Sequence, residues 1–483
     1  MELQVEDIQR AVEGRLLQGG HDRLLRGVST DSRTIQAGEL FIALKGERFD
    51  GHTFIKEVLD RHASGLIVGK GFNPTEVPSQ KKEIPVIQVD DTLKALGDLA
   101  SFWRQRNRAT VVAITGSNGK TTTREMAATI LNHSHRVLKP ERNWNNLIGL
   151  PLTLLRLKPH HKIALVEMGM NRKDEIKRLS QIAKPQIGLI TNIGPSHLQY
   201  LKTIENVAKA KGELFESLTS ESHAVVNTDD HLVVRLAKSC PARKVTFGIH
   251  SQAQLTATDT IASDCSTHSF TLKIERDRIP IVLKTPGLHN IYNALAAASI
   301  ATILKLNLEE IKAGLESFTA FSARTDITTI DHNIHIINDT YNANPKSMEM
   351  ALQLLSRLKG KDRGIAVLGD MLELGEASEE WHRQIGSLIK TLDIDAVFLI
   401  GAYAHVVADS ATSHGVSEKA IHIGTTHEQI AQTLCKKANE HDWILFKGSR
   451  GMKMERILEQ FIQMKTNASK VSSASAVTAG CNH

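Results

Sequence analysis

The chain has 483 residues, which at roughly 100–200 residues per domain indicates about three domains and excludes a single small binding module. Hydrophobic residues make up 41% of the chain and charged residues 23%, values close to the globular average that argue against wholesale disorder. The formal charge of +6 comes from 59 basic and 53 acidic residues spread along the chain, without the basic stripe or arm typical of a nucleic-acid binder.

The sequence shows no pattern of a membrane anchor or an export signal. Its longest apolar stretch, 294–304, has about half of the ~20 residues that span a bilayer. The N-terminal residues are acidic and amphipathic, without the basic-then-apolar order of a signal peptide. We therefore expect a soluble cytoplasmic protein with no nucleic-acid partner and no membrane insertion. A monomer is expected, but the sequence leaves the oligomeric state open. The cysteines are far apart and form no Cys-x-x-Cys pair, which argues against a disulfide framework or a zinc site: Cys240, Cys265, Cys435 and Cys481.

Short apolar runs that alternate with helical periodicity predict an α/β protein with parallel sheets and crossover helices. We expect three domains, at 1–108, 109–321 and 322–466. The last stretch, 467–483, is rich in Ser and Ala, lacks periodicity and is expected to be a disordered tail. The strands are expected at 39–44, 66–68 and 86–89 in the first domain, at 110–115, 163–167, 187–191 and 224–227 in the second, and at 334–338, 364–368, 396–400 and 443–446 in the third.

The most informative stretch joins the strand expected at 110–115 to a helix expected from Thr122 to Leu131. Glycines let backbone N–H groups close on an anion, and the helix N-terminus adds a favourable dipole. Lys120 is expected to reach the outer phosphates of a nucleotide, and the Thr121 hydroxyl to hold Mg²⁺. A glycine turn without a ligand is the alternative, but it leaves the Lys-Thr pair unexplained. The loop reads Gly116-Ser117-Asn118-Gly119-Lys120-Thr121-Thr122.

Two more polar residues follow the ends of expected strands. Glu167 ends the strand at 163–167, and His197 follows the strand at 187–191. Both are expected to converge near Thr121, because ligands bind at the carboxyl ends of parallel strands. A carboxylate, a hydroxyl and an imidazole around one phosphate loop suit a divalent metal. Taken alone, Glu167 could equally be a solvated strand end.

The loop at 115–122 resembles the ATP loop of the Mur ligase family, the ATP-dependent amide ligases of peptidoglycan precursor synthesis. The resemblance implies a central P-loop-type ATPase sheet flanked by a small N-terminal α/β substrate domain and a C-terminal Rossmann-like domain. It also implies that ATP and Mg²⁺ are used. The matching stretches follow one another along nearly the whole chain, at 31–33, 38–52, 143–151, 338–347, 369–375 and 447–450.

The resemblance further implies which residues surround the nucleotide. Lys120, Lys211 and His197 would be catalytic, with Lys211 carbamylated so that its side chain is anionic. Taken alone, Lys211 would be a surface lysine on a helix, and Lys209 competes for the role, although the spacing to Leu214 and Phe215 favours Lys211. The metal would be held by Thr121, Glu167, His197 and the Lys211 carbamate. ATP would be bound by Gly116, Ser117, Asn118, Gly119, Lys120, Thr121, Thr122, Asn290, Asn293, Arg324 and Asp339.

Two stretches narrow the resemblance within the family. The run from Asp339 to Pro345 is similar to the branch that joins D-alanyl-D-alanine to UDP-N-acetylmuramoyl-tripeptide through an acyl phosphate. In branches that accept longer peptides, the region matching 31–52 holds the uridine diphosphate end of the substrate. The substrate-binding residues would therefore be Ser32, Arg33, Lys45, Gly46, Asp50, Gly51, Asn145, Asn146, Tyr341 and Asn344.

Three alternatives stay open from the sequence. A sister ligase that adds a single amino acid, or a folylpolyglutamate synthase, would fit the phosphate loop but not the segments at 31–52 and 341–345. A binding or regulatory protein that only hydrolyses ATP would not need Glu167, His197 and Lys211 together. Either diaminopimelate or lysine fits as the third residue of the tripeptide.

Overall fold

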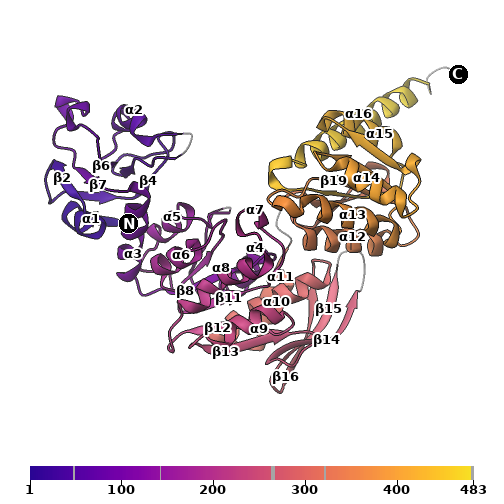
Figure 1. Cartoon of the computed structure of the whole chain (residues 1–483), viewed down its shortest axis with the longest axis horizontal. Helices are drawn as coiled ribbons and strands as arrows, with labels where there is room; N and C mark the ends of the chain where they lie inside the picture. The colour runs from indigo at the N-terminus through magenta and orange to yellow at the C-terminus, as the bar shows by residue number, and fades with distance from the viewer. Residues whose placement is uncertain (47–48, 142, 263–266, 320–322, 480–483) are drawn as a thin grey trace.

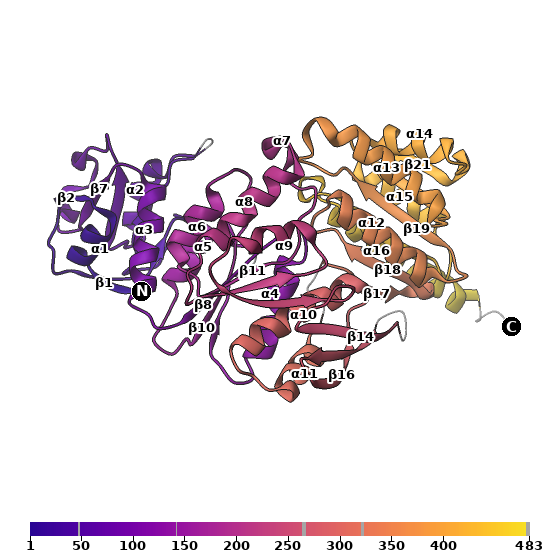
Figure 2. The same ribbon diagram turned by 60° about the horizontal axis from the view of Figure 1, so that its bottom comes forward.

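The structure is a computed structural model that describes residues 1–46, 49–141, 143–262, 267–319 and 323–479. Figure 1 shows three bodies in chain order, with the N-terminal and C-terminal bodies on opposite sides of the central one. A second view, in Figure 2, shows the same succession. The three-domain α/β architecture expected from the sequence is confirmed, while the exact boundaries at 108 and 321 stay predictions; residue 321 lies outside the described residues.

The N-terminal body is built on a mixed five-stranded sheet in the order β2-β7-β6-β5-β4. A separate two-stranded sheet pairs β1 with β3. Helix α3 begins after Asp91, whose carboxylate accepts from the backbone N–H groups of Leu93 and Lys94 and caps the helix. The elements are β1 Glu2–Gln4, α1 Val5–Val12, β2 Arg15–Gln18, β3 Leu24–Arg26, β4 Val28–Ser29, β5 Leu40–Ile42, α2 Ile55–Asp60, β6 Gly65–Gly69, β7 Val86–Val89 and α3 Thr92–Gln105.

The central body contains a nine-stranded sheet in the order β16-β15-β14-β13-β12-β11-β8-β10-β9. In this spatial order, all neighbours from β9 at one edge to β14 pair in parallel, β8 included. The last strands, β14, β15 and β16, pair antiparallel. The elements are β8 Thr110–Thr115, α4 Lys120–Leu131, β9 Val137–Leu138, α5 Gly149–Leu155, β10 Ile163–Glu167, α6 Glu175–Ala183, β11 Ile187–Ile190, α7 Leu198–Leu201, α8 Ile204–Glu216, β12 His223–Asn227, α9 His231–Lys238, β13 Arg243–Gly248, β14 Leu255–Ala262, β15 His268–Ile274, β16 Asp277–Leu283, α10 Leu288–Ile303 and α11 Leu308–Ser317.

The strand β8 lies between β10 and β11, and all three are parallel. Their residues are almost entirely buried, which fits their continuous apolar sequences, because parallel sheets are covered on both faces. The segments after these strands therefore meet at one edge of the sheet. This arrangement places the phosphate loop, Glu167 and the chain leading to His197 next to one another.

The C-terminal body has a six-stranded sheet in the order β17-β18-β22-β19-β20-β21, parallel except for the edge strand β17. The helices α12 and α13 face the central body in Figure 1. The elements are β17 Asp326–Ile330, β18 Ile334–Asp339, α12 Pro345–Lys359, β19 Gly364–Gly369, the short 3-10 helix η5 Gly375–Ala377, α13 Ser378–Thr391, β20 Ala396–Ile400, α14 Ala404–Ser413, β21 Ile421–Gly424, α15 His427–Lys437, β22 Trp443–Lys447 and α16 Glu455–Ala479.

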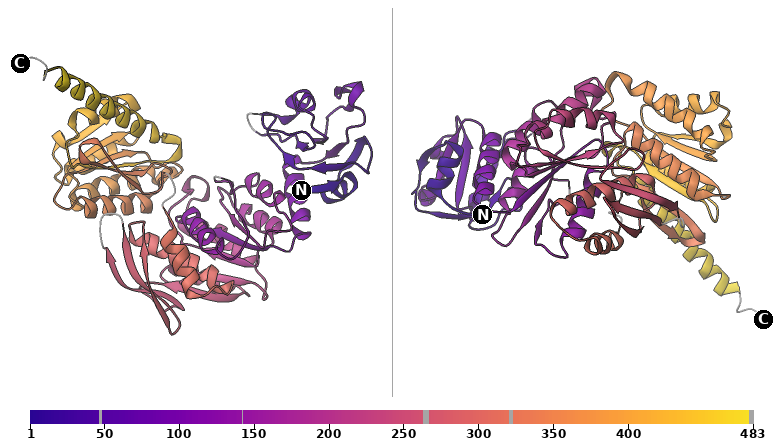
Figure 3. Two further views of the ribbon diagram at one scale, coloured as in Figure 1. Left: turned by 180° about the vertical axis from the view of Figure 1, so that it is seen from behind. Right: turned by 90° about the horizontal axis from the view of Figure 1, so that it is seen from below.

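The C-terminal end differs from the disordered tail expected at 467–483. Helix α16 continues through 467–479, and 480–483 lie outside the described residues. Figure 3 shows the end of this helix pointing away from the body of the molecule. The physical reason is that alanine has the best helix propensity and that the first turns of α16 are anchored by Ile457 and Phe461, both buried. No helix in the described part of the chain is long and apolar enough to cross a membrane.

Candidate active site

A cavity of about 1080 Å³ lies between the strand ends of the central sheet and the C-terminal body. Most of the residues predicted to bind ATP, metal or substrate line it. These are Ser117, Asn118, Gly119, Lys120, Thr121, Thr122, Asn145, Asn146, Glu167, His197, Asn290, Asn293, Arg324, Asp339, Tyr341 and Asn344.

The phosphate loop has a backbone that only glycine accommodates at two positions. Gly116 has φ +145°, and a Cβ there would lie 1.9 Å from the Thr191 hydroxyl oxygen. Gly119, at the N-cap of α4, has φ +79°, and a Cβ there would lie 2.2 Å from Oδ1 of Asn293. The glycines thus permit both the left-handed turns and the close approach of neighbouring side chains. The loop leads directly into the N-terminus of α4, an environment suited to an anion.

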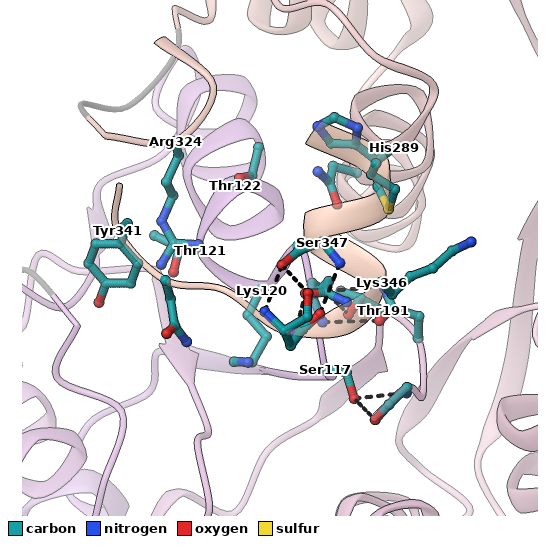
Figure 4. Close-up of a pocket in the computed structure, with 18 of the residues that line it drawn as sticks. Ser117, Lys120, Thr121, Thr122, Thr191, His289, Arg324, Tyr341, Lys346 and Ser347 are labelled. Carbon is teal, nitrogen blue, oxygen red and sulfur yellow. Dashed lines mark hydrogen bonds between the residues drawn. The ribbon is translucent and has the colours of Figure 1, made fainter. Parts of the chain in front are cut away.

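The segment after β11 fixes the loop from one side. The hydroxyl of Ser117 donates to the carbonyl of Gly194 at 3.0 Å, and the Asn118 N–H donates to Oδ1 of Asn192 at 3.0 Å. The Thr191 hydroxyl donates to the Asn118 carbonyl at 2.6 Å. Figure 4 shows Ser117 and Thr191 around the same loop. These hydrogen bonds hold the loop in shape.

Glu167 and Thr121 lie in direct contact at the base of the loop. The Thr121 hydroxyl donates to Oε2 of Glu167 at 2.9 Å, and Asn145 donates to Oε1 at 2.9 Å. The guanidinium of Arg124 contacts Oε2 at 3.2 Å. Burial alone would raise the pKa of Glu167, but the charges of Lys120 and Arg124 outweigh burial and hold that pKa below its usual value. Glu167 is thus an oriented, ionised carboxylate beside the Thr121 hydroxyl.

Lys211 is buried beneath the loop, whereas Lys209 is exposed on α8. The Lys211 ammonium donates to the carbonyl of Gly116 at 3.1 Å. Lys120 donates to the same carbonyl at 2.8 Å. Burial and, to a smaller extent, the charge of Lys120 lower the pKa of Lys211 well below its usual value. Of the two lysines that the sequence left open, Lys211 is the one that contacts the loop, although it is not among the residues that line the cavity.

His197 precedes α7 and contacts the C-terminal body. Its Nδ1 lies 2.7 Å from Oε2 of Glu373. This hydrogen bond is the largest cause that lowers the pKa of Glu373, so that its carboxyl is ionised at neutral pH. His197 shares the cavity with Thr121 and Glu167, but its side chain is hydrogen-bonded to Glu373 rather than to either of them.

Asn290 and Asn293 lie on the first turns of α10, where the cavity wall passes behind the loop. Asn293 donates to Oδ1 of Asn290 at 3.1 Å, and Asn290 donates to the carbonyl of Pro286 at 2.7 Å. The Thr123 hydroxyl donates to Oδ1 of Asn293 at 3.2 Å. These bonds orient both amides, and Asn293 also supports Gly119.

The C-terminal body contributes an arginine that contacts an aromatic ring. The Arg324 guanidinium lies 3.9 Å from the ring centroid of Tyr341, and Arg450 lies 5.9 Å from the same centroid in a second cation–π contact. Figure 4 shows Arg324 and Tyr341 side by side. The buried Nε of Arg324 has no hydrogen-bond partner among the described residues. An unsatisfied buried donor in a cavity wall favours an anionic ligand.

Two other predicted residues of the C-terminal body already have protein partners. Asn344 caps α12 by accepting from Ser347 N–H at 2.9 Å, and its amide donates to Oδ1 of Asn118 at 2.8 Å. Asp339 accepts from Lys447 at 2.5 Å. Asn344 therefore links α12 to the phosphate loop.

The residues predicted to bind the uridine end lie in the N-terminal body, outside this cavity. Arg33 pairs with Asp31 at 2.6 Å, and Lys45 lies 4.0 Å from Asp50. Asp50 also caps the turn that begins at Gly51. The remaining two, Ser32 and Gly46, belong to the same pair of loops. The structure gathers these residues in one body and separates them from the cavity.

The donor set at the loop fits a hard cation. Among the described residues no three His, Cys, Asp or Glu side chains cluster as a complete metal site. Thr121 and Glu167 nevertheless present a hydroxyl and a carboxylate in contact, and Mg²⁺ in nucleotide enzymes takes one or two such protein ligands plus phosphates and water. The residues therefore fit Mg²⁺ bound together with a nucleotide.

Sequence reasoning gave no role to Arg124, Glu373 or Arg450. Glu373 and Arg450 could have been singled out, because they lie in the segments 369–375 and 447–450, which resemble the family. No sequence pattern pointed to Arg124, because its burial between Glu125 and Glu167 depends on the folded sheet.

Three family models match consecutive parts of the chain: "Mur ligase family, catalytic domain" at 24–104, "Mur ligase middle domain" at 114–301 and "Mur ligase, glutamate ligase domain" at 323–450. A relative from Bacillus subtilis (strain 168), named UDP-N-acetylmuramoyl-tripeptide–D-alanyl-D-alanine ligase, is 38% identical over 95% of this chain and 98% of its own length. The chain belongs to the Mur ligase family. The membership expected from the sequence is confirmed.

Further Mur ligases support this membership. A relative of the same name from Escherichia coli (strain K12) is 36% identical over 91% of this chain and 94% of its own. A crystal structure of MurF from Acinetobacter baumannii has a TM-score of 0.87 at 30% identity and covers 96% of this chain and 99% of its own. MurF from Thermotoga maritima in complex with ADP has a TM-score of 0.80 at 26% identity, with coverages of 91% and 97%.

Proposed function

We propose that this Mur ligase joins D-alanyl-D-alanine to UDP-N-acetylmuramoyl-tripeptide with conversion of ATP to ADP and phosphate. The observation that carries the proposal is the cavity in which the phosphate loop, Glu167 and the C-terminal Arg324 face one another. Relatives that span nearly the whole chain carry this activity in their names. ATP use is supported by the loop and by the ADP complex of a similar structure.

The reaction needs an activated carboxyl group, because a free carboxylate is a poor acyl donor. The terminal carboxylate of the tripeptide attacks the γ-phosphorus of ATP and forms an acyl phosphate, releasing ADP. The amine of D-alanyl-D-alanine then attacks the acyl carbon, the C–O bond to phosphate breaks, and the amine loses a proton. Protein residues contribute positioning and charge in such phosphoryl transfers rather than covalent chemistry.

Lys120 and the loop N–H groups would neutralise and orient the outer phosphates. The unpartnered Nε of Arg324 would contact a phosphate from the C-terminal body, and Asn290 and Asn293 would flank the adenine. Asp339 would contribute through Lys447, with which it is paired. A phosphate loop and an arginine from different bodies imply that the C-terminal body closes over ATP.

We further propose that Thr121, Glu167, His197 and a carbamylated Lys211 hold Mg²⁺. The contact between Thr121 and Glu167 supports this, as does the low pKa of Lys211. Bound Mg²⁺ would neutralise the charge on the phosphates. A lysine must be neutral to add to CO₂, and the product, formed with loss of one proton, is an anionic carbamate. Burial therefore prepares Lys211 for the modification.

The residues Ser32, Arg33, Lys45, Gly46, Asp50 and Gly51 would hold the uridine diphosphate end, while Asn145, Asn146, Tyr341 and Asn344 would line the peptide end. We also propose a cytoplasmic location, since ATP and a nucleotide-linked precursor are cytoplasmic molecules.

A phosphate-release assay tests the proposal. Release should require ATP, the nucleotide-linked tripeptide and D-alanyl-D-alanine together, with either diaminopimelate or lysine as the third residue of the tripeptide. Single amino acids in place of the dipeptide would indicate a sister ligase if they supported release. Release from ATP alone, at the same rate, would indicate an ATPase that does not ligate.

A further inference from the structure

Glu373 of the C-terminal body contacts the central body at two points. Its Oε2 lies 2.7 Å from Nδ1 of His197, although 176 residues separate the two in the chain. Its backbone carbonyl accepts a hydrogen bond from the N–H of Gln199 at 2.9 Å. Glu373 therefore holds both the imidazole ring and the backbone that carries it.

The two segments approach one another closely where these bonds form. Gly375 packs so near to α7 that a Cβ on it would lie 3.0 Å from the Cα of Gln199. His197 and Glu373 both have positive φ, at 55° and 64°, which is uncommon outside glycine. Such backbone strain persists where surrounding contacts enforce it, and it collects at functional sites. Figure 1 shows α7 next to the C-terminal body.

The ring nitrogens of His197 have different surroundings. Nδ1 faces the Glu373 carboxylate, whereas Nε2 has no hydrogen-bond partner among the described residues. Histidines that bind metals commonly donate their second ring N–H to a carboxylate, which fixes the tautomer and the orientation of the ring. With Nδ1–H donated to Glu373, the lone pair on Nε2 is available to a cation in the cavity that His197 lines.

We propose that Glu373 is a positioning residue that orients His197 for metal binding, so that the metal site is complete only when the C-terminal body rests on α7. The inference depends on the proposed function, in which His197 binds the metal. Glu373 belongs to the body that also supplies Arg324. Docking of the C-terminal body would therefore orient His197 toward the metal and bring Arg324 to the phosphates in one movement.

Metal binding after removal of Glu373 distinguishes an orienting contact from one that holds His197 away from the metal. If Glu373 held the ring away from the metal, its removal would tighten metal binding. If Glu373 orients the ring, its removal weakens metal binding. Substitution of a residue that hydrogen-bonds a metal ligand typically lowers metal affinity or activity about ten- to a hundredfold.

The experiment measures Mn²⁺ affinity by electron paramagnetic resonance of the free ion, on the full-length protein with a non-hydrolysable ATP analogue and without turnover. The variants are Glu373→Ala, Glu373→Gln, His197→Ala and the double variant. Glu376→Ala is the matched control, an exposed carboxylate three residues further on. Thermal melting of each variant shows that it is folded.

We expect Glu373→Ala to weaken Mn²⁺ binding about tenfold or more. Gln keeps an acceptor for Nδ1–H, so Glu373→Gln should recover part of the loss, while Glu376→Ala should bind as the wild type does. In the His197→Ala background, removing Glu373 should have no further effect. Unchanged or tighter binding in Glu373→Ala, with His197→Ala still weakened, overturns this inference alone. Unchanged binding in His197→Ala overturns the proposed metal role of His197 itself.

Discussion

Lys120 and Lys211 donate to the same acceptor, the carbonyl oxygen of Gly116, at 2.8 and 3.1 Å. Lys120 comes from the phosphate loop and is partly buried, whereas Lys211 reaches the carbonyl from α8 and is fully buried. Two ammonium groups on one carbonyl repel one another by several kcal/mol at an effective dielectric near 20, by order of magnitude. The arrangement is relieved if one lysine is uncharged or anionic, and Lys211 is the one whose pKa is lowered furthest by burial.

The first prediction concerns Lys211. Lys211→Ala should fold normally but lose nearly all ligation, because the proposed carbamate is removed from the metal site. Formate, which can occupy the vacated space as a small carboxylate, should restore part of the activity. The measurement is phosphate release with and without formate. Lys209→Ala, an exposed lysine on the same helix, is the control and should resemble the wild type; a dead Lys209 variant beside an active Lys211 variant would reverse the assignment.

The second prediction concerns Lys120. Lys120→Met keeps the length of the side chain but removes its charge. Ligation should fall by several orders of magnitude, because the positive charge of Lys120 stabilises the negative charge on the phosphoryl group during its transfer. The melting temperature without nucleotide should be unchanged or higher, because burial lowers the pKa of Lys120 and the charge is costly in the empty site. Calorimetric unfolding and phosphate release measure the two effects. Near-normal turnover would remove the phosphate-loop assignment.

The parallel strands could be predicted from the sequence almost to the residue. The strands expected at 110–115 and 163–167 coincide with β8 and β10, because both run through the buried centre of the sheet and are apolar throughout. The antiparallel strands β15 and β16 were not predicted. Buried residues alternate with less buried ones in both strands, so they lack the continuous apolar runs by which the parallel strands were recognised.

The candidate site was predictable where its residues are close in sequence or follow strand ends. The glycine loop and Glu167 belong to this group. The pairing of His197 with Glu373 was not predictable, because it joins two bodies across 176 residues and depends on how they dock. The same holds for the burial of Arg124 between Glu125 and Glu167, which a helix sequence does not reveal.

The third prediction concerns the end of α16. Removal of residues 470–483 should leave ligation and the melting temperature unchanged within error. The buried residues that attach α16 to the C-terminal sheet, Ile457, Leu458 and Phe461, all precede the deletion, and Figure 3 shows the helix end directed away from the body. Removal from residue 455 onwards, which takes those anchors away, should lower the melting temperature by several degrees or more. A large loss from the shorter deletion would mean that the end of the helix contacts the body.

The fourth prediction concerns the pH dependence of stability. Burial lowers the pKa of His289 to about 4, against about 6.5 for an unfolded histidine. Between these values the unfolded chain binds more protons than the folded one, so the free energy of unfolding falls as the pH drops from about 6.5 to about 4. His289 accounts for up to about 3 kcal/mol of that fall. In His289→Gln the free energy of unfolding, measured with urea without nucleotide, should decline less steeply over this range. His405→Gln, at an exposed position, should keep the wild-type slope. An equal slope in the His289 variant would show that this ring is protonated as readily in the folded protein as in the unfolded chain.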